Sequence, residues 1–243
     1  MKDYGSSTYG DRIAEVYDEW HAGLDPTPAV ETLAGLAGSG PVLELAIGTG
    51  RIALPLARRG VDVYGIDASE AMVAKLREKP GGERIPVTIG DFADVGVDGS
   101  FAVVFVAFNT FFALLTQEEQ VRCFTNVAAR LAEGGSFVLE VFVPDLARFD
   151  RSQRVSVTEV ELDRIKLEVS RHDAVAQTVA SQHVAVSDAG LQLHPVSLRY
   201  AWPAELDLMG RLAGLRLVER WEGWSGEPFT SASKQHVSVY RRS

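Results

Sequence analysis

Residues Val42–Ala57 read VLELAIGTGRIALPLA, and this stretch decides the fold. Its first residues are mostly apolar, as in a buried strand, and its last residues form an apolar-rich helical segment. Between them, Gly48, Gly50 and Ala53 have the spacing G-x-G-x-x-G/A of a tight turn between a strand and a helix. Such a turn lets the backbone approach a ligand closely and presents free amide groups at the start of the helix. The stretch therefore predicts a strand–turn–helix unit that binds a polar or anionic ligand.

The same alternation of strands and helices continues as far as Pro144. Continuous apolar strands separated by amphipathic helices indicate a parallel sheet with helices on both faces. A capping box formed by Thr116 and Glu119 predicts that one helix begins at Gln117. The predicted strands are Val42–Ala46, Val61–Ile66, Pro86–Ile89, Phe101–Ala107 and Ser136–Phe142, and the predicted helices lie near Arg51–Arg59, Ser69–Lys79 and Gln117–Ala132.

Between Arg154 and Tyr200 the pattern changes. The segments there are rich in β-branched residues, alternate in part and are separated by turn residues, which predicts an antiparallel meander of three or four strands. A helix over Pro203–Ala213 and two strands, over residues 215–221 and 234–242, are expected after it. The fold class is therefore α/β: a doubly wound, mostly parallel seven-stranded sheet with an inserted antiparallel β-meander.

The composition limits the partners and the environment of the chain. The net charge of −9 opposes contact with nucleic-acid phosphates and anionic lipids, so we expect neither as a partner. No stretch approaches the roughly 20 apolar residues of a membrane helix, and the first residues do not form a signal peptide. The single cysteine, Cys123, allows no internal disulfide, and the five histidines lack metal-ligand spacing. We expect a cytoplasmic protein without a metal site.

The N-terminal segment Tyr9–His21 is predicted to form a short helix. Ile13, Val16, Tyr17 and Trp20 recur at helical spacing and would share one face. This face either packs on the core or closes over the ligand as a lid, and the two roles are compatible.

Three acidic residues narrow the choice of ligand. Asp67 ends the second predicted strand, where doubly wound folds place a carboxylate that accepts hydrogen bonds from ribose hydroxyls. Asp91 follows the third strand and, with Phe92, could meet the edge and face of an adenine. Glu44 lies inside an otherwise apolar strand, where a carboxylate is costly unless it has a donor partner. A fixed functional role explains Glu44 better than chance does.

These residues resemble the motifs of the class I S-adenosylmethionine-dependent methyltransferases. Glu44, Ala46, Gly48 and Gly50 match motif I, written E/D-x-G/A-x-G-x-G, in order. The resemblance implies that Asp67 binds the ribose and that Asp91 and Phe92 contact the adenine. It covers Pro41 to Phe142 without a break and includes LAEGGSFVLEVF around the fifth strand. It implies S-adenosylmethionine as cofactor and S-adenosylhomocysteine as product.

The layout is also similar to actinobacterial-type small-molecule methyltransferases of natural-product pathways, including sugar N-methyltransferases. In that family a tyrosine-bearing N-terminal helix lies over the cofactor and an antiparallel sheet is inserted late in the chain. The resemblance implies that Tyr9, Arg12 and Tyr17 close over the methionine end and that Arg12 pairs with its carboxylate. It divides the chain into a helical lid (1–40), a cofactor-binding core (41–153 and 203–243) and a β insertion on the substrate side (154–202).

The end of the fourth strand is where methyl donor and acceptor are expected to meet. Phe108 and Asn109 stand there without the Asn/Asp-Pro-Pro-aromatic signature of adenine-N methyltransferases, which argues against DNA methylation. Cys123 lacks the Pro-Cys context of a cytosine methyltransferase. The remaining predicted cofactor contacts are Ala68, Met72, Phe108 and Asn109, and the candidate catalytic residues are His183, His194, Asn109 and Tyr17.

The predicted reaction is an in-line transfer of a methyl group from S-adenosylmethionine to an oxygen, nitrogen or carbon of a small metabolite. One alternative is a protein that binds this cofactor without transferring the methyl group, as a scaffold or rearrangement catalyst. A weaker alternative is an NAD-dependent oxidoreductase. The acceptor, the general base, the number of methyl groups and the oligomeric state stay open, with a homodimer as one option.

Overall fold

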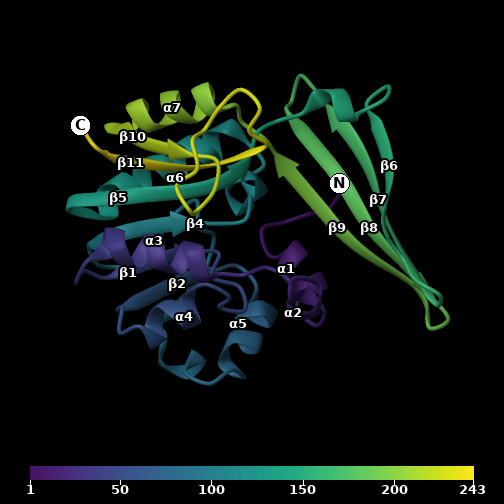
Figure 1. Ribbon diagram of the computed structural model, residues 1–243, viewed down its shortest axis with the longest axis horizontal. Helices are drawn as coiled ribbons and strands as arrows, with labels where there is room; N and C mark the ends of the chain where they lie inside the picture. The colour runs from purple at the N-terminus through teal and green to yellow at the C-terminus, as the bar shows by residue number, and fades with distance from the viewer.

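The computed structural model describes residues 1–243 and contains two β-sheets (Figure 1). The larger sheet has seven strands in the order β10-β11-β5-β4-β1-β2-β3. Strands β1 to β5 are parallel, and β10 and β11 are added at the β5 edge in antiparallel pairing. The predicted fold class is confirmed. The strands are β1 (Val42–Leu45), β2 (Val63–Asp67), β3 (Val87–Ile89), β4 (Phe101–Val106), β5 (Leu131–Phe142), β10 (Leu215–Trp221) and β11 (Gln235–Arg242).

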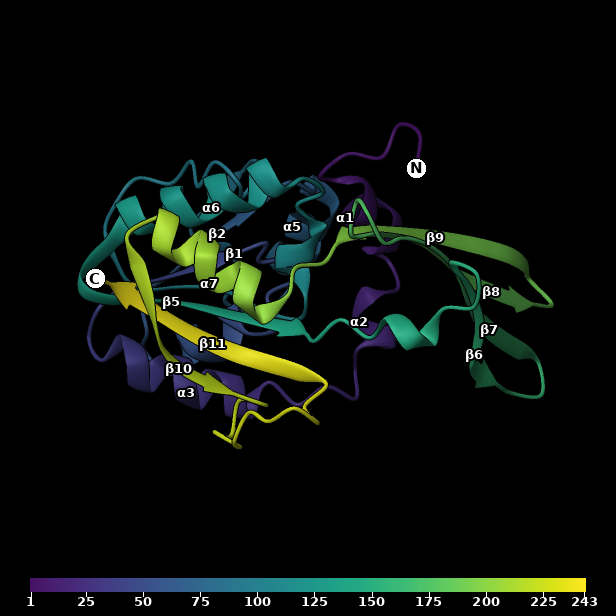
Figure 2. The same ribbon diagram turned by 90° about the horizontal axis from the view of Figure 1, so that it is seen from above.

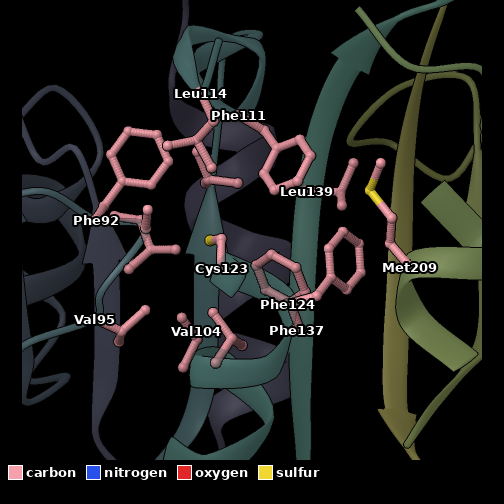
Figure 3. Close-up of a cluster of buried hydrophobic side chains, with 14 of the residues drawn as sticks. Phe92, Val95, Val104, Phe111, Leu114, Cys123, Phe124, Phe137, Leu139 and Met209 are labelled. Carbon is pink, nitrogen blue, oxygen red and sulfur yellow. The ribbon is translucent and has the colours of Figure 1, made fainter. Parts of the chain in front are cut away.

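Helices cover both faces of this sheet, as the near-continuous apolar character of its central strands requires. Helices α3 (Thr27–Ala37) and α4 (Ala53–Arg58) pack on one face. Helices α6 (Gln117–Arg130) and α7 (Pro203–Leu212) pack on the other, as Figure 2 shows. A cluster of buried hydrophobic side chains lies under α6 and α7. Phe124 and Cys123 of α6 are in its centre, between the strands and the loop that carries Phe92 (Figure 3). Cys123 is a core residue.

Local signals set most helix boundaries. The capping box is present, because the Thr116 side chain accepts from the Glu119 amide and the Glu119 carboxylate accepts from the Thr116 amide. Helix α6 ends at Arg130, two residues earlier than predicted, because Leu131 already lies in β5. Ser69 caps α5 (Glu70–Arg77) by accepting from the Met72 amide.

The predicted single helix over Tyr9–His21 is wrong. The structure has two short helices, α1 (Thr8–Ile13) and α2 (Tyr17–Trp20), separated by a turn. Ile13 and Ala14 are buried against Met72 of α5, and the chain then bends so that Tyr17 can reach the cofactor cavity described below. Tertiary packing therefore overrides the helical spacing.

Helix α3 was not predicted as a separate element. Its apolar residues Val30, Leu33 and Ala37 are buried in the core cluster below the seven-stranded sheet. Pro28 near its start and this spacing are the signals that could have revealed it. Within residues 1–40, only the segment before α3 therefore lies near the lid position.

The meander forms a separate antiparallel sheet in the order β6-β7-β8-β9. It projects from the core beyond α1 and α2 (Figure 1). Its strands are β6 (Gln153–Val160), β7 (Arg164–Asp173), β8 (Thr178–Ser187) and β9 (Gly190–Arg199).

The two faces of the meander carry different kinds of side chain, and the more polar face is the one that turns toward the core. The face turned toward the core carries polar residues, among them Glu168, Ser181 and His183. The opposite face exposes aliphatic side chains: Val155 is 68% exposed and Leu191 is 62% exposed.

No helix of the chain is long and apolar enough to cross a membrane.

Candidate active site

One cavity lies at the carboxyl ends of β1, β2 and β4, beneath the N-terminal segment. Parallel sheets of this kind bind ligands at this edge. Eleven of the fourteen predicted cofactor contacts line it, whereas Arg12, Gly50 and Asn109 do not. The eleven are Tyr9, Tyr17, Glu44, Ala46, Gly48, Asp67, Ala68, Met72, Asp91, Phe92 and Phe108.

Asp67 holds the glycine turn in place. Its Oδ2 accepts from the Gly48 amide at 2.7 Å and its Oδ1 accepts from the Ser69 amide at 2.8 Å. Burial raises the pKa of Asp67, although these amides act in the opposite direction. Each oxygen keeps a further lone pair, so the carboxylate can still accept from a ligand hydroxyl.

The glycine turn has left-handed backbone conformations. The φ angle is 57° at Ala46 and 56° at Gly48, so the turn is strained at a non-glycine residue beside the cavity. Gly50 has a φ of 80° and leaves no room for a Cβ beside Leu76, so this position requires glycine for conformation and packing.

The buried Glu44 and the half-buried Arg51 lie near each other at the cavity wall. Glu44 is 5% exposed, and its Oε2 has no hydrogen-bond partner. Burial raises the pKa of Glu44 well above its usual range, while Arg51 opposes this rise. Arg51 Nε is also buried without a partner, and its guanidinium lies 5.2 Å from the centre of the Phe108 ring. Unpaired buried groups of opposite charge suit a zwitterionic ligand.

Arg51, rather than the predicted Arg12, is the arginine that lines the cavity. The Arg12 side chain is exposed and does not line the cavity, and its main-chain oxygen accepts from Nδ1 of His194 at 3.2 Å. Sequence reasoning missed Arg51, although it directly follows Gly50 at the start of the helical stretch. That position is the only signal that could have found it.

Tyr9 and Tyr17 bring phenol groups from the N-terminal segment into the cavity. Burial raises the pKa of both hydroxyls, and for Tyr17 the neighbouring Arg51 opposes the rise. Both phenols therefore stay protonated near neutral pH. Tyr17 is thus a poor candidate for a general base.

His21 lies beside this site and was not predicted. Its Nδ1 donates to the Tyr17 main-chain oxygen at 2.8 Å, and its ring meets the Phe108 ring edge-on at a centroid distance of 5.1 Å. Because Nδ1 carries the proton, Nε2 keeps a free lone pair. Burial lowers the pKa of His21, so the ring is neutral near pH 7.

Asn109 has a backbone role. Phe108 and Asn109 have φ angles of 56° and 65°, and three hydrogen bonds hold them against β5. The Phe108 amide donates to Glu140 Oε2 at 2.7 Å, the Asn109 amide donates to the Glu140 main-chain oxygen at 3.0 Å, and the Phe142 amide donates to Asn109 Oδ1 at 2.6 Å. Asn109 thus shapes the end of β4 without lining the cavity.

The two candidate histidines of the meander lie outside this cavity. His194 is 7% exposed and packs edge-on against Trp20, with 4.7 Å between the ring centres. His183 lines a second cavity, between β5 and the meander. Neither residue therefore belongs to the wall of the first cavity.

The end of the cavity near Asp91 and Phe92 suits a planar nucleobase. Asp91 Oδ1 accepts from the Ala93 amide at 2.8 Å, which leaves Oδ2 available, and Phe92 is 8% exposed. Leu114 and Leu115 also line the cavity, after the short helix η2 (Thr110–Ala113). These two leucines were not predicted.

Polar contacts fasten the N-terminal segment to the core. Asp18 accepts from the Thr49 hydroxyl at 2.7 Å and pairs with Lys79 at 2.6 Å, and Asp11 accepts from the Ser69 hydroxyl at 2.6 Å. Partial burial would raise the pKa of Asp18, but Lys79 and Thr49 outweigh it and lower that pKa. The cavity beneath the segment has a volume of about 230 Å³.

The residues present fit S-adenosylmethionine. The unpaired Glu44 oxygen suits the methionine ammonium, and Arg51 suits the methionine carboxylate. Asp67 suits the ribose, and Asp91 with Phe92 suits the adenine. The φ of 56° at Gly48 provides close access to the backbone.

Comparisons with known proteins agree with this site. The profile of a methyltransferase domain matches residues 42–135. A cypemycin N-terminal methyltransferase from Streptomyces sp. is 30% identical over 97% of this chain and 98% of its own length. The structure of the CcbJ methyltransferase from Streptomyces caelestis superposes with a TM-score of 0.93 at 44% identity, over 99% of this chain and 100% of that one. The sugar N-methyltransferase KedS8 from Streptoalloteichus sp. shares the fold, with a TM-score of 0.69 at 23% identity, over 100% of this chain and 99% of that one.

Fold and site together define an S-adenosylmethionine-dependent methyltransferase. The chain belongs to the methyltransferase family that includes the cypemycin and CcbJ enzymes.

Proposed function

We propose that this enzyme methylates an amine nitrogen on a small molecule or a short peptide. The observation that carries this proposal is the protonation state of the groups around the end of β4. Tyr9 and Tyr17 have raised pKa values because they are buried, and burial lowers the pKa of His21. The phenols are not ionised near neutral pH, and the lowered pKa of His21 makes its free Nε2 a weak base, so these groups favour an acceptor that reacts without first losing a proton. A neutral amine needs no such step, because its nitrogen is already nucleophilic.

The relatives support the same acceptor class. The relative that spans almost the whole chain is named for N-terminal methylation of cypemycin. A peptide amine and an amino sugar present the same reacting group, a neutral amine nitrogen. Natural-product biosynthesis is the proposed setting.

The main contributions of the protein are alignment and removal of water. S-adenosylmethionine, when bound, supplies an electrophilic methyl group on a sulfonium that departs as a neutral thioether. Glu44, Arg51 and Asp67 bind the two ends of this cofactor, and Tyr9 and Tyr17 exclude water above it. The new nitrogen–carbon bond leaves a proton on the nitrogen. Its proposed acceptor is Nε2 of His21, whose ring packs against Phe108 of the cavity wall.

Residues 4–20 are the proposed lid, since Tyr4, Tyr9 and Tyr17 line the cavity and α3 packs in the core. An NAD-binding role is disfavoured, because it explains Asp67 but leaves the buried Glu44 and Asp91 of the same cavity without a function.

The test is methyl transfer from radiolabelled S-adenosylmethionine to matched acceptor pairs. Suitable pairs are benzylamine with benzyl alcohol, an amino sugar with the parent sugar, and a tripeptide with a free or an acetylated N-terminus. We expect label only on members that carry a free amine. Label on the alcohols, with none on the amines, would overturn the proposal. Firm cofactor binding without transfer to any amine would favour a protein that binds S-adenosylmethionine for another purpose.

A further inference from the structure

A second cavity of about 370 Å³ separates the core from the polar face of the meander. Its core side is the end of β5 and the loop that follows, including Phe142, Leu146 and Phe149. Its meander side includes Val196 and Leu198 of β9. This apolar lining suits an aliphatic or aromatic body. The established motifs do not assign a role to this cavity.

Glu168 is the most deeply placed charge in this cavity. Its side chain is 20% exposed, and Arg148, 3.7 Å away, is 39% exposed. The Ser170 hydroxyl donates to Glu168 Oε1 at 2.8 Å. The other charged residues of the wall, Asp145 and Lys234, are exposed, and Asp145 already accepts from the Ala147 amide. Glu168 therefore keeps a capacity to bind a cation that these partners do not fill.

The neighbour of Glu168 across the sheet does not neutralise it. Glu168 pairs in register with His183, and His183 pairs with His194 on the next strand. His183 also lines the cavity. Burial lowers the pKa of His183, against the opposing charge of Glu168, so the imidazole is neutral near pH 7. The carboxylate thus faces the cavity beside a neutral ring.

The second cavity adjoins the end of β4, where donor and acceptor are expected to meet. Phe142 lines this cavity, and its amide donates to Asn109 Oδ1. Phe108, the residue before Asn109, lines the cofactor cavity. Trp20 of the proposed lid lies 6.2 Å from His183 between ring centres. The walls of the two cavities are therefore linked through Phe108, Asn109 and Phe142 at the ends of β4 and β5.

We propose that the second cavity binds the acceptor and that Glu168 recognises an ammonium group on it, separate from the neutral nitrogen that receives the methyl group. This inference rests on the proposed function, since it assigns a binding residue to its acceptor. The substrate class is a cationic molecule with an apolar body. A carboxylate binds an ammonium through charge-assisted hydrogen bonds, which are about twice as strong as neutral ones.

The test measures binding of 4-phenylbutylamine and its isostere 4-phenylbutan-1-ol to enzyme saturated with S-adenosylhomocysteine. We expect the wild-type enzyme to bind the amine at least about tenfold more tightly than the alcohol. In Glu168→Gln this preference should fall below about threefold. Glu161→Gln, a change at an exposed residue in the loop between β6 and β7, is the matched control and should keep the preference.

Two results would overturn the inference: equal binding of both probes by the wild-type enzyme, or an amine preference that survives in Glu168→Gln. Thermal stabilisation by S-adenosylhomocysteine verifies that each variant is folded, and Glu168→Asp, which keeps the charge, should restore part of the preference. Transfer of methyl groups to amines that does not depend on Glu168 would sink this inference and leave the proposed function intact. Glu168-dependent amine binding without any methyl transfer would do the reverse.

Discussion

The amide of Gly48 donates to Oδ2 of Asp67 at 2.7 Å, so the acid at the end of β2 positions the glycine turn after β1. One carboxylate thereby serves the shape of the turn and the proposed contact with the ribose. Loss of this carboxylate removes both at once.

Asp67→Ala should weaken S-adenosylhomocysteine binding by about 100-fold, since charged hydrogen bonds contribute about 1.5–3 kcal/mol each. Asp67→Asn should lose less, because it keeps one acceptor oxygen. Isothermal titration calorimetry measures both. Asp62→Ala, an exposed aspartate just before the same strand, is the control and should bind normally. Unchanged binding in Asp67→Ala would refute the assignment.

Arg51→Gln should reduce affinity for S-adenosylhomocysteine by tenfold or more, because it removes the half-buried cation that lies near Glu44. Arg12→Gln should change it by less than about twofold, since the Arg12 side chain is exposed. The two variants carry the same substitution and are compared in one calorimetric titration. The reverse order of effects would restore Arg12 as the carboxylate partner.

Asp18→Asn should make product leave faster. It removes the ion pair with Lys79 that helps to fasten the proposed lid. Exposed pairs contribute about 0.2–1 kcal/mol, so release should speed up by about 1.4- to fivefold. Stopped-flow displacement of S-adenosylhomocysteine measures the rate. Asp25→Asn, an exposed change between α2 and α3, should leave the rate as it is in the wild-type enzyme. An unchanged rate in Asp18→Asn would mean that this pair does not limit release.

Asn109 can be tested with two substitutions. Asn109→Asp keeps an acceptor for the Phe142 amide and tolerates the left-handed backbone, whereas Asn109→Ala does neither. Turnover should stay within about threefold of wild type in Asn109→Asp and fall more than tenfold in Asn109→Ala, with cofactor affinity nearly constant. Steady-state kcat and KM decide the matter. Complete loss of turnover in Asn109→Asp would instead indicate a direct role for the side-chain amide nitrogen.

His236 should make the fold sensitive to acid. It is completely buried, and burial, assisted by Arg220, lowers its pKa to about 3 from an ordinary value of 6.5. The unfolded chain therefore takes up a proton below pH 6.5 that the folded chain refuses until about pH 3. Stability is fully present above pH 6.5 and falls by about 1.4 kcal/mol for each pH unit below it.

Urea unfolding at several pH values measures this slope. His236→Gln should be less stable at pH 7 but should show a flatter dependence between pH 6 and pH 4. His172→Gln, at a half-buried position, should keep the wild-type slope. An equal slope in His236→Gln would show that another group causes the acid sensitivity.

Much of the core could be predicted because its signals are local. The apolar runs of β1 and β4, the capping box at Thr116 and the acids at strand ends each act within a few residues. Parallel strands then bring those ends to one edge, so Glu44, Asp67 and Asp91 meet in the cofactor cavity. Distance along the chain does not matter once the topology is known.

The remaining features depend on tertiary contacts. Helical spacing over Tyr9–His21 could not show that burial of Ile13 against Met72 would bend the segment. The choice between Arg12 and Arg51 depends on which side chain the bend leaves in solvent. Alternation in the meander revealed strands but not their orientation, because the face that packs toward the core is the polar one.

Because of that orientation, the meander residues proposed to select the acceptor are not the residues that stabilise the packed core. Strands β6 and β7 contribute no side chain to the three buried apolar clusters. A replacement of Glu168, the β7 residue in the wall of the second cavity, would thus alter the proposed acceptor site without removing atoms from the packed interior. The enzyme combines a rigid platform for the methyl donor with a wall that mutation can remodel at little cost to folding.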